Sequence, residues 1–171
     1  MIVTGTLSNH TFKVLLSKTL GKGSYGCVYE CVNMQTKAKY AIKLFKSTLR
    51  DIVRSQLILK EVQVLKLVSG QKGLPNLIDY GQLRYESNLH YFVILEHLGE
   101  DLSLTDIDAS TCIRVGLQVL NSIESLHELG YIHGDVKPNN ILLKNGKASL
   151  IDFGLSTKYV DEFGNHVPNK K

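Results

Sequence analysis

Short apolar runs separated by glycine and polar turns dominate the first hundred residues and predict a strand-rich region. The predicted strands, rich in β-branched and aromatic residues, lie at 12–20, 27–32, 40–45, 76–83 and 88–95. Residues 49–68 instead follow a helical period, with one apolar face made of Leu57, Ile58, Leu65 and Val68. The pattern predicts a small antiparallel sheet of five strands with one helix packed on it.

After Gly99 the spacing of apolar residues becomes helical over a longer stretch. Residues 110–129 carry an apolar face of Ile113, Leu117, Leu120, Ile123 and Leu126. Gly130 follows at the position where such a helix would end. This change near Leu98 predicts an α+β protein with a strand-rich part, 1–98, and a helix-rich part, 99–171. A cleft between two such parts is a favoured place for a ligand.

Composition narrows the class of protein. The 171 residues are 43% apolar and 21% charged, which is ordinary for a globular chain and excludes a collagen-like or largely disordered one. The net charge of +4 is spread along the sequence, so it suits an anionic ligand and does not indicate nucleic-acid binding. No apolar run is long enough for a membrane span or a signal peptide. The cysteines lack the Cys-x-x-Cys spacing of zinc sites and are expected as reduced thiols in the cytoplasm or nucleus: Cys27, Cys31 and Cys112.

The glycines of Gly21-Lys-Gly-Ser-Tyr-Gly26 match the pattern G-x-G-x-x-G. In a dinucleotide-binding fold they would open a helix, with an acidic residue about 20 positions further on. Here a strand-like run follows and Lys43 stands near that position, so the dinucleotide interpretation fails. Two interpretations remain open. One is a hairpin whose backbone N–H groups approach a polyphosphate while Val28 packs on a flat base, and the other is an ordinary glycine-rich hairpin.

Lys43 and Glu61 form the second candidate feature. A strand lysine such as Lys43 is usually just solvated. Glu61, however, lies four residues from both Leu57 and Leu65 and therefore projects from the apolar face of its helix. An unpaired carboxylate there would be costly to desolvate, so Glu61 should have a cationic partner, and Lys43 is the best candidate.

Residues 131–154 concentrate polar side chains in short loops between apolar runs: Asp135, Lys137, Asn140 and Asp152. Carboxylate and carboxamide oxygens suit Mg²⁺, and one carboxylate remains to accept a proton from a hydroxyl group. Ordinary turns would explain one such residue. They do not explain four, together with a phosphate-binding turn and a Lys–Glu pair upstream.

These motifs together resemble the eukaryotic protein kinases, in which a glycine-rich loop, a strand lysine, a helix glutamate, a catalytic loop and Asp-Phe-Gly occur in this order. The resemblance covers residues 12 to about 167. It implies a bilobal kinase fold, with a five-stranded N-lobe and one helix in 1–98 and an incomplete helical C-lobe in 99–171. It also implies a transferase that uses ATP and Mg²⁺ to phosphorylate protein hydroxyls.

The resemblance assigns a role to each matching residue. The nucleotide would be bound by Gly21, Lys22, Gly23, Ser24, Gly26, Val28, Ala41, Lys43, Glu61, Leu95, Glu96 and Leu98. Of these, Lys43 would bind the α- and β-phosphates while paired with Glu61, and residues 95–98 would supply the gatekeeper and the adenine-binding hinge. The remaining roles concern phosphoryl transfer: Asp135 would accept the hydroxyl proton, Lys137 would neutralise the γ-phosphate, and Asn140 and Asp152 would hold Mg²⁺.

The catalytic loop indicates a subgroup. Asp-x-Lys-x-x-Asn is the serine/threonine form of the family, and residues 95–102, 133–135 and 152–159 are similar to the casein kinase I group and its vaccinia-related branch. Gly134 replaces the arginine that ordinarily pairs with an activation-loop phosphate, so we expect activity without that phosphorylation. We expect His133 to hold the loop by hydrogen bonds rather than to act as a base.

Two functions stay open because the chain ends at Lys171, where the family's helical lobe continues. One is a serine/threonine protein kinase, and the alternative is a truncated, non-catalytic nucleotide-binding or interaction module derived from a kinase. Lys158, Lys170 and Lys171 either attract acidic protein substrates or are simply solvated. The helix at 110–129 should lack part of its partner surface, so a partner that covers the incomplete C-lobe is expected. No nucleic-acid or membrane partner is expected.

Overall fold

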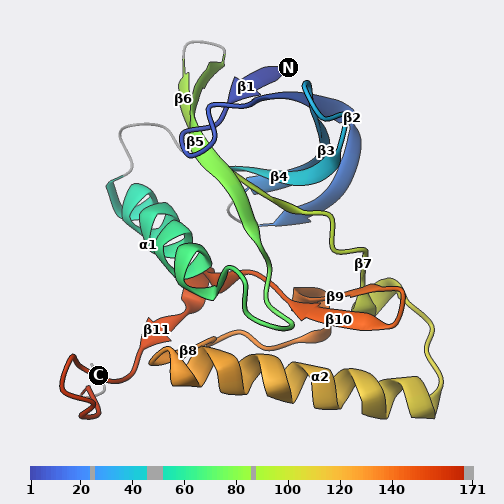
Figure 1. The fold of residues 1–171 in the computed structure, drawn as a ribbon, viewed down its shortest axis with the longest axis vertical. Coiled ribbons are helices and arrows are strands. Elements are labelled where there is room, and N and C mark those ends of the chain that lie inside the picture. The colour runs from blue at the N-terminus through green and yellow to red at the C-terminus, as the bar shows by residue number, and fades with distance from the viewer. Residues whose placement is uncertain (24–25, 46–51, 86–87, 168–171) are drawn as a thin grey trace. The chain divides into compact units, whose positions relative to one another are not determined.

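The computed structural model describes residues 1–23, 26–45, 52–85 and 88–167 (Figure 1). The chain divides into two compact units, the first made of residues 1–62 and 77–97 and the second of residues 63–76 and 98–171. Each unit has buried apolar residues of its own. The functional division into an N-lobe and a partial C-lobe at residue 98 stays a prediction.

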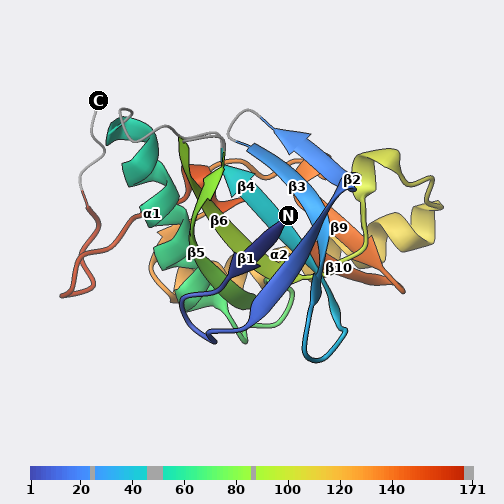
Figure 2. The same cartoon turned by 90° about the horizontal axis from the view of Figure 1, so that it is seen from above.

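A six-stranded antiparallel sheet forms the first unit, with the strand order β1-β2-β3-β4-β6-β5. Its strands are β1 (Ile2–Thr4), β2 (Thr11–Gly23), β3 (Gly26–Asn33), β4 (Lys39–Phe45), β5 (Leu77–Tyr85) and β6 (Asn88–Glu96). All five expected strands are present. The structure adds β1, which pairs with the beginning of β2 at the edge of the sheet (Figure 2). Three residues are too few to show the alternation by which a strand is recognised in a sequence.

Helix α1 (Ile52–Val68) corresponds to the predicted helix, of which residues 49–51 lie outside the described part. Its first part runs alongside β5 and β6 in both views (Figures 1 and 2). Of the expected apolar face, three residues are buried and Leu57 is half-buried. The core of the sheet consists of Val3, Phe12, Val14, Cys31, Ile42, Phe92 and Ile94.

Helix α2 (Ala109–Glu128) is the main element of the second unit. Asp108 caps it by accepting a hydrogen bond from the Thr111 amide at 2.6 Å. Short elements surround the loops of interest: β7 (Glu100–Asp101), η1 (Leu102–Leu104), β8 (Tyr131–Ile132), η2 (Pro138–Asn140), β9 (Ile141–Lys144), β10 (Lys147–Leu150), η3 (Phe153–Leu155) and β11 (Thr157–Lys158). Strand β10 packs on α2, where the Gln118 side chain accepts a hydrogen bond from the Ala148 amide at 2.9 Å. The loops 133–137 and 151–156 therefore emerge from paired strands.

Helix α2 carries apolar residues on two sides. Its buried residues are Val115, Val119, Ser122 and Leu126. Three residues of the face expected from the sequence, Ile113, Leu117 and Leu120, are between 58% and 66% exposed. The helix is confirmed, and the partner expected to cover this face stays a prediction. The inward-facing residues, apart from Leu126, were not predicted. Among the described residues, no helix is long and apolar enough to cross a membrane.

Asp79 ties the segment between β1 and β2 to β5. Its side chain is fully buried and accepts hydrogen bonds from the Leu7 amide at 2.9 Å, the Ser8 amide at 3.1 Å and the Ser8 hydroxyl. The Tyr80 amide donates a further bond at 2.8 Å. Burial alone would raise the pKa of Asp79, but these hydrogen bonds outweigh it and hold the pKa below its usual value.

Replacing this carboxylate should destabilise the first unit. We expect Asp79→Asn to lower the free energy of unfolding by about 1–3 kcal/mol at pH 7, because an amide cannot accept all four bonds. The folded-state pKa of Asp79 is lowered, so its contribution is present above the unfolded pKa and is lost as the pH falls through the folded pKa. Urea denaturation at pH 7 and below pH 4 measures both effects, with the exposed Asp106→Asn as control. Equal stability of Asp79→Asn and wild type at pH 7 would contradict this assignment.

Candidate active site

The sheet register places several predicted nucleotide-binding residues in one row. Gly21 lies opposite Val28, and Val28 lies opposite Lys43. Two residues before Lys43, Ala41 lies opposite Leu95 on β6. Directly opposite residues of an antiparallel pair share one face of the sheet, so all five lie on the same face. The contact of this face with a nucleotide stays a prediction.

The glycine-rich segment is a hairpin. Gly23 at the end of β2 pairs with Gly26 at the start of β3, and Lys22 pairs with Cys27. Ser24, another residue of the predicted set, lies outside the described residues. The hairpin that both interpretations of this motif require is therefore present, and its contact with phosphate stays a prediction.

Lys43 and Glu61 form a partly buried ion pair in the first unit. The Lys43 Nζ and Glu61 Oε1 atoms are 2.6 Å apart, with the two side chains 16% and 7% exposed. Lys43 Nζ also lies 5.0 Å from the centre of the Phe45 ring. The partner expected for Glu61 from its place on the apolar face of α1 is thus present. The pair holds the ammonium group in a fixed position on the sheet.

The predicted hinge begins at the end of β6. Leu95 pairs with Ala41 and Leu77, and Glu96, the last residue of β6, pairs with Tyr40. Leu98 follows as the first residue of this stretch that belongs to the second unit. The sheet therefore fixes Leu95 and Glu96, and the adenine contacts of residues 95–98 stay a prediction.

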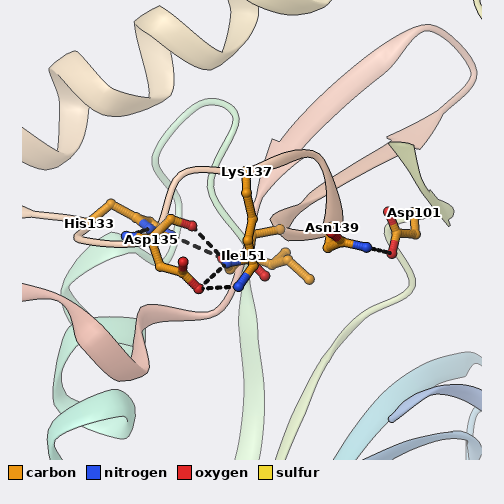
Figure 3. A network of polar contacts seen from close by, with 7 residues as sticks. Asp101, His133, Asp135, Lys137, Asn139 and Ile151 are labelled. Carbon is orange, nitrogen blue, oxygen red and sulfur yellow. Dashed lines mark hydrogen bonds and ion pairs between the residues drawn. The ribbon is translucent and has the colours of Figure 1, made fainter. Parts of the chain in front are cut away.

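In the second unit, Asp135 is the centre of a hydrogen-bonded group (Figure 3). Its Oδ2 atom lies 2.7 Å from Lys137 Nζ and accepts a bond from Asn140 Nδ2 at 2.9 Å. The same Asn140 amide donates to the Asp135 carbonyl at 2.8 Å. The pKa of Asp135 is held below its usual value. The Lys137 ammonium is the main cause, and the bond from Asn140 adds to it. Asp135 is therefore ionised at neutral pH and can accept a hydroxyl proton.

The buried side chain of His133 holds the loop around Asp135 in place. It is 2% exposed, its Nδ1 accepts the Asp135 amide at 3.2 Å, and its Nε2 lies 3.0 Å from the Ile151 carbonyl. These partners assign the proton to Nε2 and make the ring neutral, since Nδ1 must accept. Burial lowers the pKa of His133 and supports the same assignment. The geometry agrees with the structural role expected for this histidine.

The predicted metal ligands flank two paired strands. Asn140 comes directly before β9, and Asp152 follows shortly after β10. The Ile151 amide, one residue before Asp152, donates to the Asn140 carbonyl at 2.8 Å. The Asn140 Nδ2 group donates two bonds to Asp135, which orients the amide. One carboxylate and one amide oxygen are hard ligands that fit Mg²⁺, which in proteins usually takes few side chains plus substrate phosphates.

Gly134 has a backbone that only glycine adopts easily, with a φ of +82°. A Cβ atom at this position would lie 2.7 Å from the Leu155 carbonyl oxygen. Glycine in place of the family's arginine therefore changes the backbone conformation at this position as well as its charge. The glycine also lets the catalytic loop approach the segment after Asp152-Phe-Gly154.

A second polar contact was not predicted from the sequence. Asn139 Nδ2 donates to Ser103 Oγ at 2.8 Å, which joins η2 to η1. It also lies 3.4 Å from Asp101 Oδ2, as Figure 3 shows. Asp101 Oδ1 also accepts the Ser103 amide at 2.8 Å. The proximity of Asn139 to the catalytic loop was visible in the sequence, but nothing there identified its partners 36 and 38 positions away.

Comparison with known proteins gives an independent result. Residues 15–167 match the model of the protein kinase domain. A probable casein kinase I homolog of Encephalitozoon cuniculi is 31% identical over 162 residues, which is 90% of this chain and 48% of that protein. A casein kinase I homolog of Kluyveromyces lactis is 30% identical over 169 residues, 91% of this chain and 30% of that protein.

A calcium/calmodulin-dependent protein kinase of Emericella nidulans is 34% identical over 163 residues, 88% of this chain and 38% of that protein. The chain thus spans between 30% and 48% of the length of these relatives. The α+β class and the predicted resemblance are confirmed, and ATP and a divalent metal are the general requirements of such a domain. On the match over residues 15–167, the chain belongs to the protein kinase family.

Proposed function

We propose that the protein is a serine/threonine kinase of the casein kinase I type that transfers the γ-phosphoryl group of ATP to protein hydroxyls. The observation that carries this proposal is the ionised Asp135 carboxylate, held by Lys137 and Asn140 in one group. A carboxylate so placed can orient the acceptor hydroxyl and take its proton while Lys137 faces the transferred phosphate. The serine/threonine form of the loop and the casein kinase I homologs among the relatives support this choice.

The remaining residues would bind the nucleotide. Lys43, fixed by Glu61, would contact the α- and β-phosphates, and the glycine hairpin would cover them. Asn140 and Asp152 would hold Mg²⁺, whose chemistry is to neutralise charge on the phosphate oxygens. In the described part of the chain no group of three or more His, Cys, Asp or Glu side chains would hold a metal ion. Phosphate oxygens would therefore complete the coordination.

The charged side chains and free thiols of the chain support a class of substrate and a cellular location. We propose acidic protein substrates, attracted by lysines such as the exposed Lys158. The three free cysteines support action in the cytoplasm or nucleus. A protein partner would cover the exposed Ile113, Leu117 and Leu120 face of α2.

Thermal melting separates the kinase from the non-catalytic module that the sequence left open. A shift of the melting temperature by Mg²⁺-ATP without phosphoryl transfer would support the module. Turnover together with the shift supports the kinase.

Asp135→Asn should abolish transfer. With radiolabelled ATP and casein as substrate, we expect a loss of about a hundredfold or more, because an amide cannot accept the hydroxyl proton. The melting shift caused by Mg²⁺-ATP should persist, since Asp135 is not among the nucleotide-binding residues. Equal signals from wild type and Asp135→Asn would mean that the activity comes from a contaminant.

Glu61→Gln should weaken the use of ATP specifically. Removing the charge that holds Lys43 should raise the KM for ATP about tenfold or more, comparable to a lost charged hydrogen bond. The control is Asp79→Asn, because Asp79 is also a buried carboxylate of this unit and lies opposite Ile94, a residue of the core on the other face of the sheet. Asp79→Asn should lower stability and leave the KM for ATP unchanged. A similar rise in KM for both variants would contradict the role of Glu61.

Phosphatase treatment should leave the activity unchanged. Gly134 offers no charge to pair with an activation-loop phosphate, and the geometry leaves little room for a side chain there. The assay compares treated and untreated protein, with mass spectrometry to confirm that phosphate was removed. Loss of activity after complete dephosphorylation would refute this expectation.

A further inference from the structure

The segment after Asp152-Phe-Gly154 is bound to the end of α2 and to β8. Strand β11 pairs with β8, so that Thr157 lies opposite Ile132 and Lys158 opposite Tyr131. The Tyr159 amide then donates to the Gly130 carbonyl at 2.9 Å. Residues 157–159 are therefore joined to residues 130–132, which lead directly into the catalytic loop.

The side chain of Tyr159 fastens this contact. Its hydroxyl donates to the His127 carbonyl at 3.0 Å. That carbonyl is in the last turn of α2 and also accepts the Gly130 amide at 2.8 Å, so the Tyr159 hydroxyl adds a second bond to it. The Tyr159 ring also packs edge-on between two histidine rings, with centre-to-centre distances of 5.8 Å to His127 and 5.5 Å to His166.

The residues that follow fold back on Tyr159. The Val167 amide donates to the Tyr159 carbonyl at 2.8 Å. The intervening turn is closed by Asp161, whose carboxylate accepts the Phe163 amide at 2.9 Å and the Asn165 amide at 2.8 Å. The turn is thus held by its own side chains and backbone.

We infer that Tyr159 is a positioning residue for Asp135. By holding residues 157–159 against 130–132, it fixes the strand from which His133 and Asp135 emerge. A second tie, from Ser156 Oγ to the His133 carbonyl at 3.2 Å, connects the same two segments. The effect of Tyr159 on phosphoryl transfer rests on the proposed kinase function, whereas its effect on the backbone does not.

Hydrogen exchange tests the backbone part without any activity. We expect Tyr159→Phe, which keeps the ring and removes one hydrogen bond, to speed exchange in residues 157–167 and at the Asp135 amide about two- to tenfold. Tyr159→Leu, which also removes the ring contacts, should have a larger effect. Tyr91→Phe removes a hydroxyl from β6 of the first unit and is the matched control, with no change expected in these residues.

Kinetics on the full chain tests the catalytic part. Well below the melting temperature, we expect Tyr159→Phe to lower kcat about two- to tenfold with the KM for ATP unchanged, because Asp135 acts on the acceptor hydroxyl. A merely structural role would lower the melting temperature and leave kcat per folded molecule unchanged.

Two results would contradict the inference, and a third would separate it from the proposed function. Unchanged exchange at 157–167 and at the Asp135 amide in both Tyr159 variants would overturn it. A rise in the KM for ATP that parallels the loss of kcat would overturn the assignment to the acceptor side. If wild type transfers no phosphoryl group at all, the proposed function fails, and the exchange at the Asp135 amide still decides whether Tyr159 positions that residue.

Discussion

The neutral, buried imidazole of His133 joins the segment that carries Asp135 to the segment that carries Asp152. One ring nitrogen accepts the Asp135 amide, and the other donates to the carbonyl of Ile151, the residue before Asp152. Its backbone carbonyl accepts a bond from Ser156, beyond Asp152. A second proton on the ring would remove the acceptor at Nδ1, so this arrangement requires a neutral ring, which the lowering of the His133 pKa by burial favours. The spacing of the catalytic loop and the Asp-Phe-Gly turn thus depends on one uncharged ring.

The same network supports a strained residue. Asp152 has a φ of 68° and a ψ of 78°, a left-handed conformation that costs about 1–2 kcal/mol in residues other than glycine. Such a conformation persists where the neighbouring residues are firmly held. Ile151 is bound through both its amide and its carbonyl, and Phe153 is fully buried with its ring 5.2 Å from that of His133. The left-handed backbone at Asp152 is therefore held by the residues on either side of it.

Residue patterns within short segments predicted much of this structure. Contacts between polar residues far apart in the sequence were not predicted. The contact between Lys43 and Glu61 was predictable because a carboxylate on an apolar helix face needs a cation. The contacts of Asn139 and Tyr159 were not, because polar and aromatic surface residues have many possible partners and no period identifies the right one. Helix α2 was recognised by its period, but apolar residues on two sides left the buried face ambiguous. The functional roles assigned to the site residues stay predictions.

Each unit holds one ion pair of predicted site residues, and the two pairs differ in how far they are exposed to solvent. Lys43 and Glu61 are 16% and 7% exposed, so breaking their pair would leave a charge with little solvent to replace its partner. Lys137 and Asp135 are 48% and 28% exposed, and water can solvate either group when the pair opens. An incoming phosphate can therefore draw Lys137 away from Asp135, while Asn140 continues to hold the carboxylate. On the proposed function, Asp135 Oδ2 then becomes available to the acceptor hydroxyl as the phosphate arrives. On the same proposal, the buried pair would hold Lys43 for the nucleotide, and the more exposed pair would link binding of the phosphate to release of the Asp135 carboxylate.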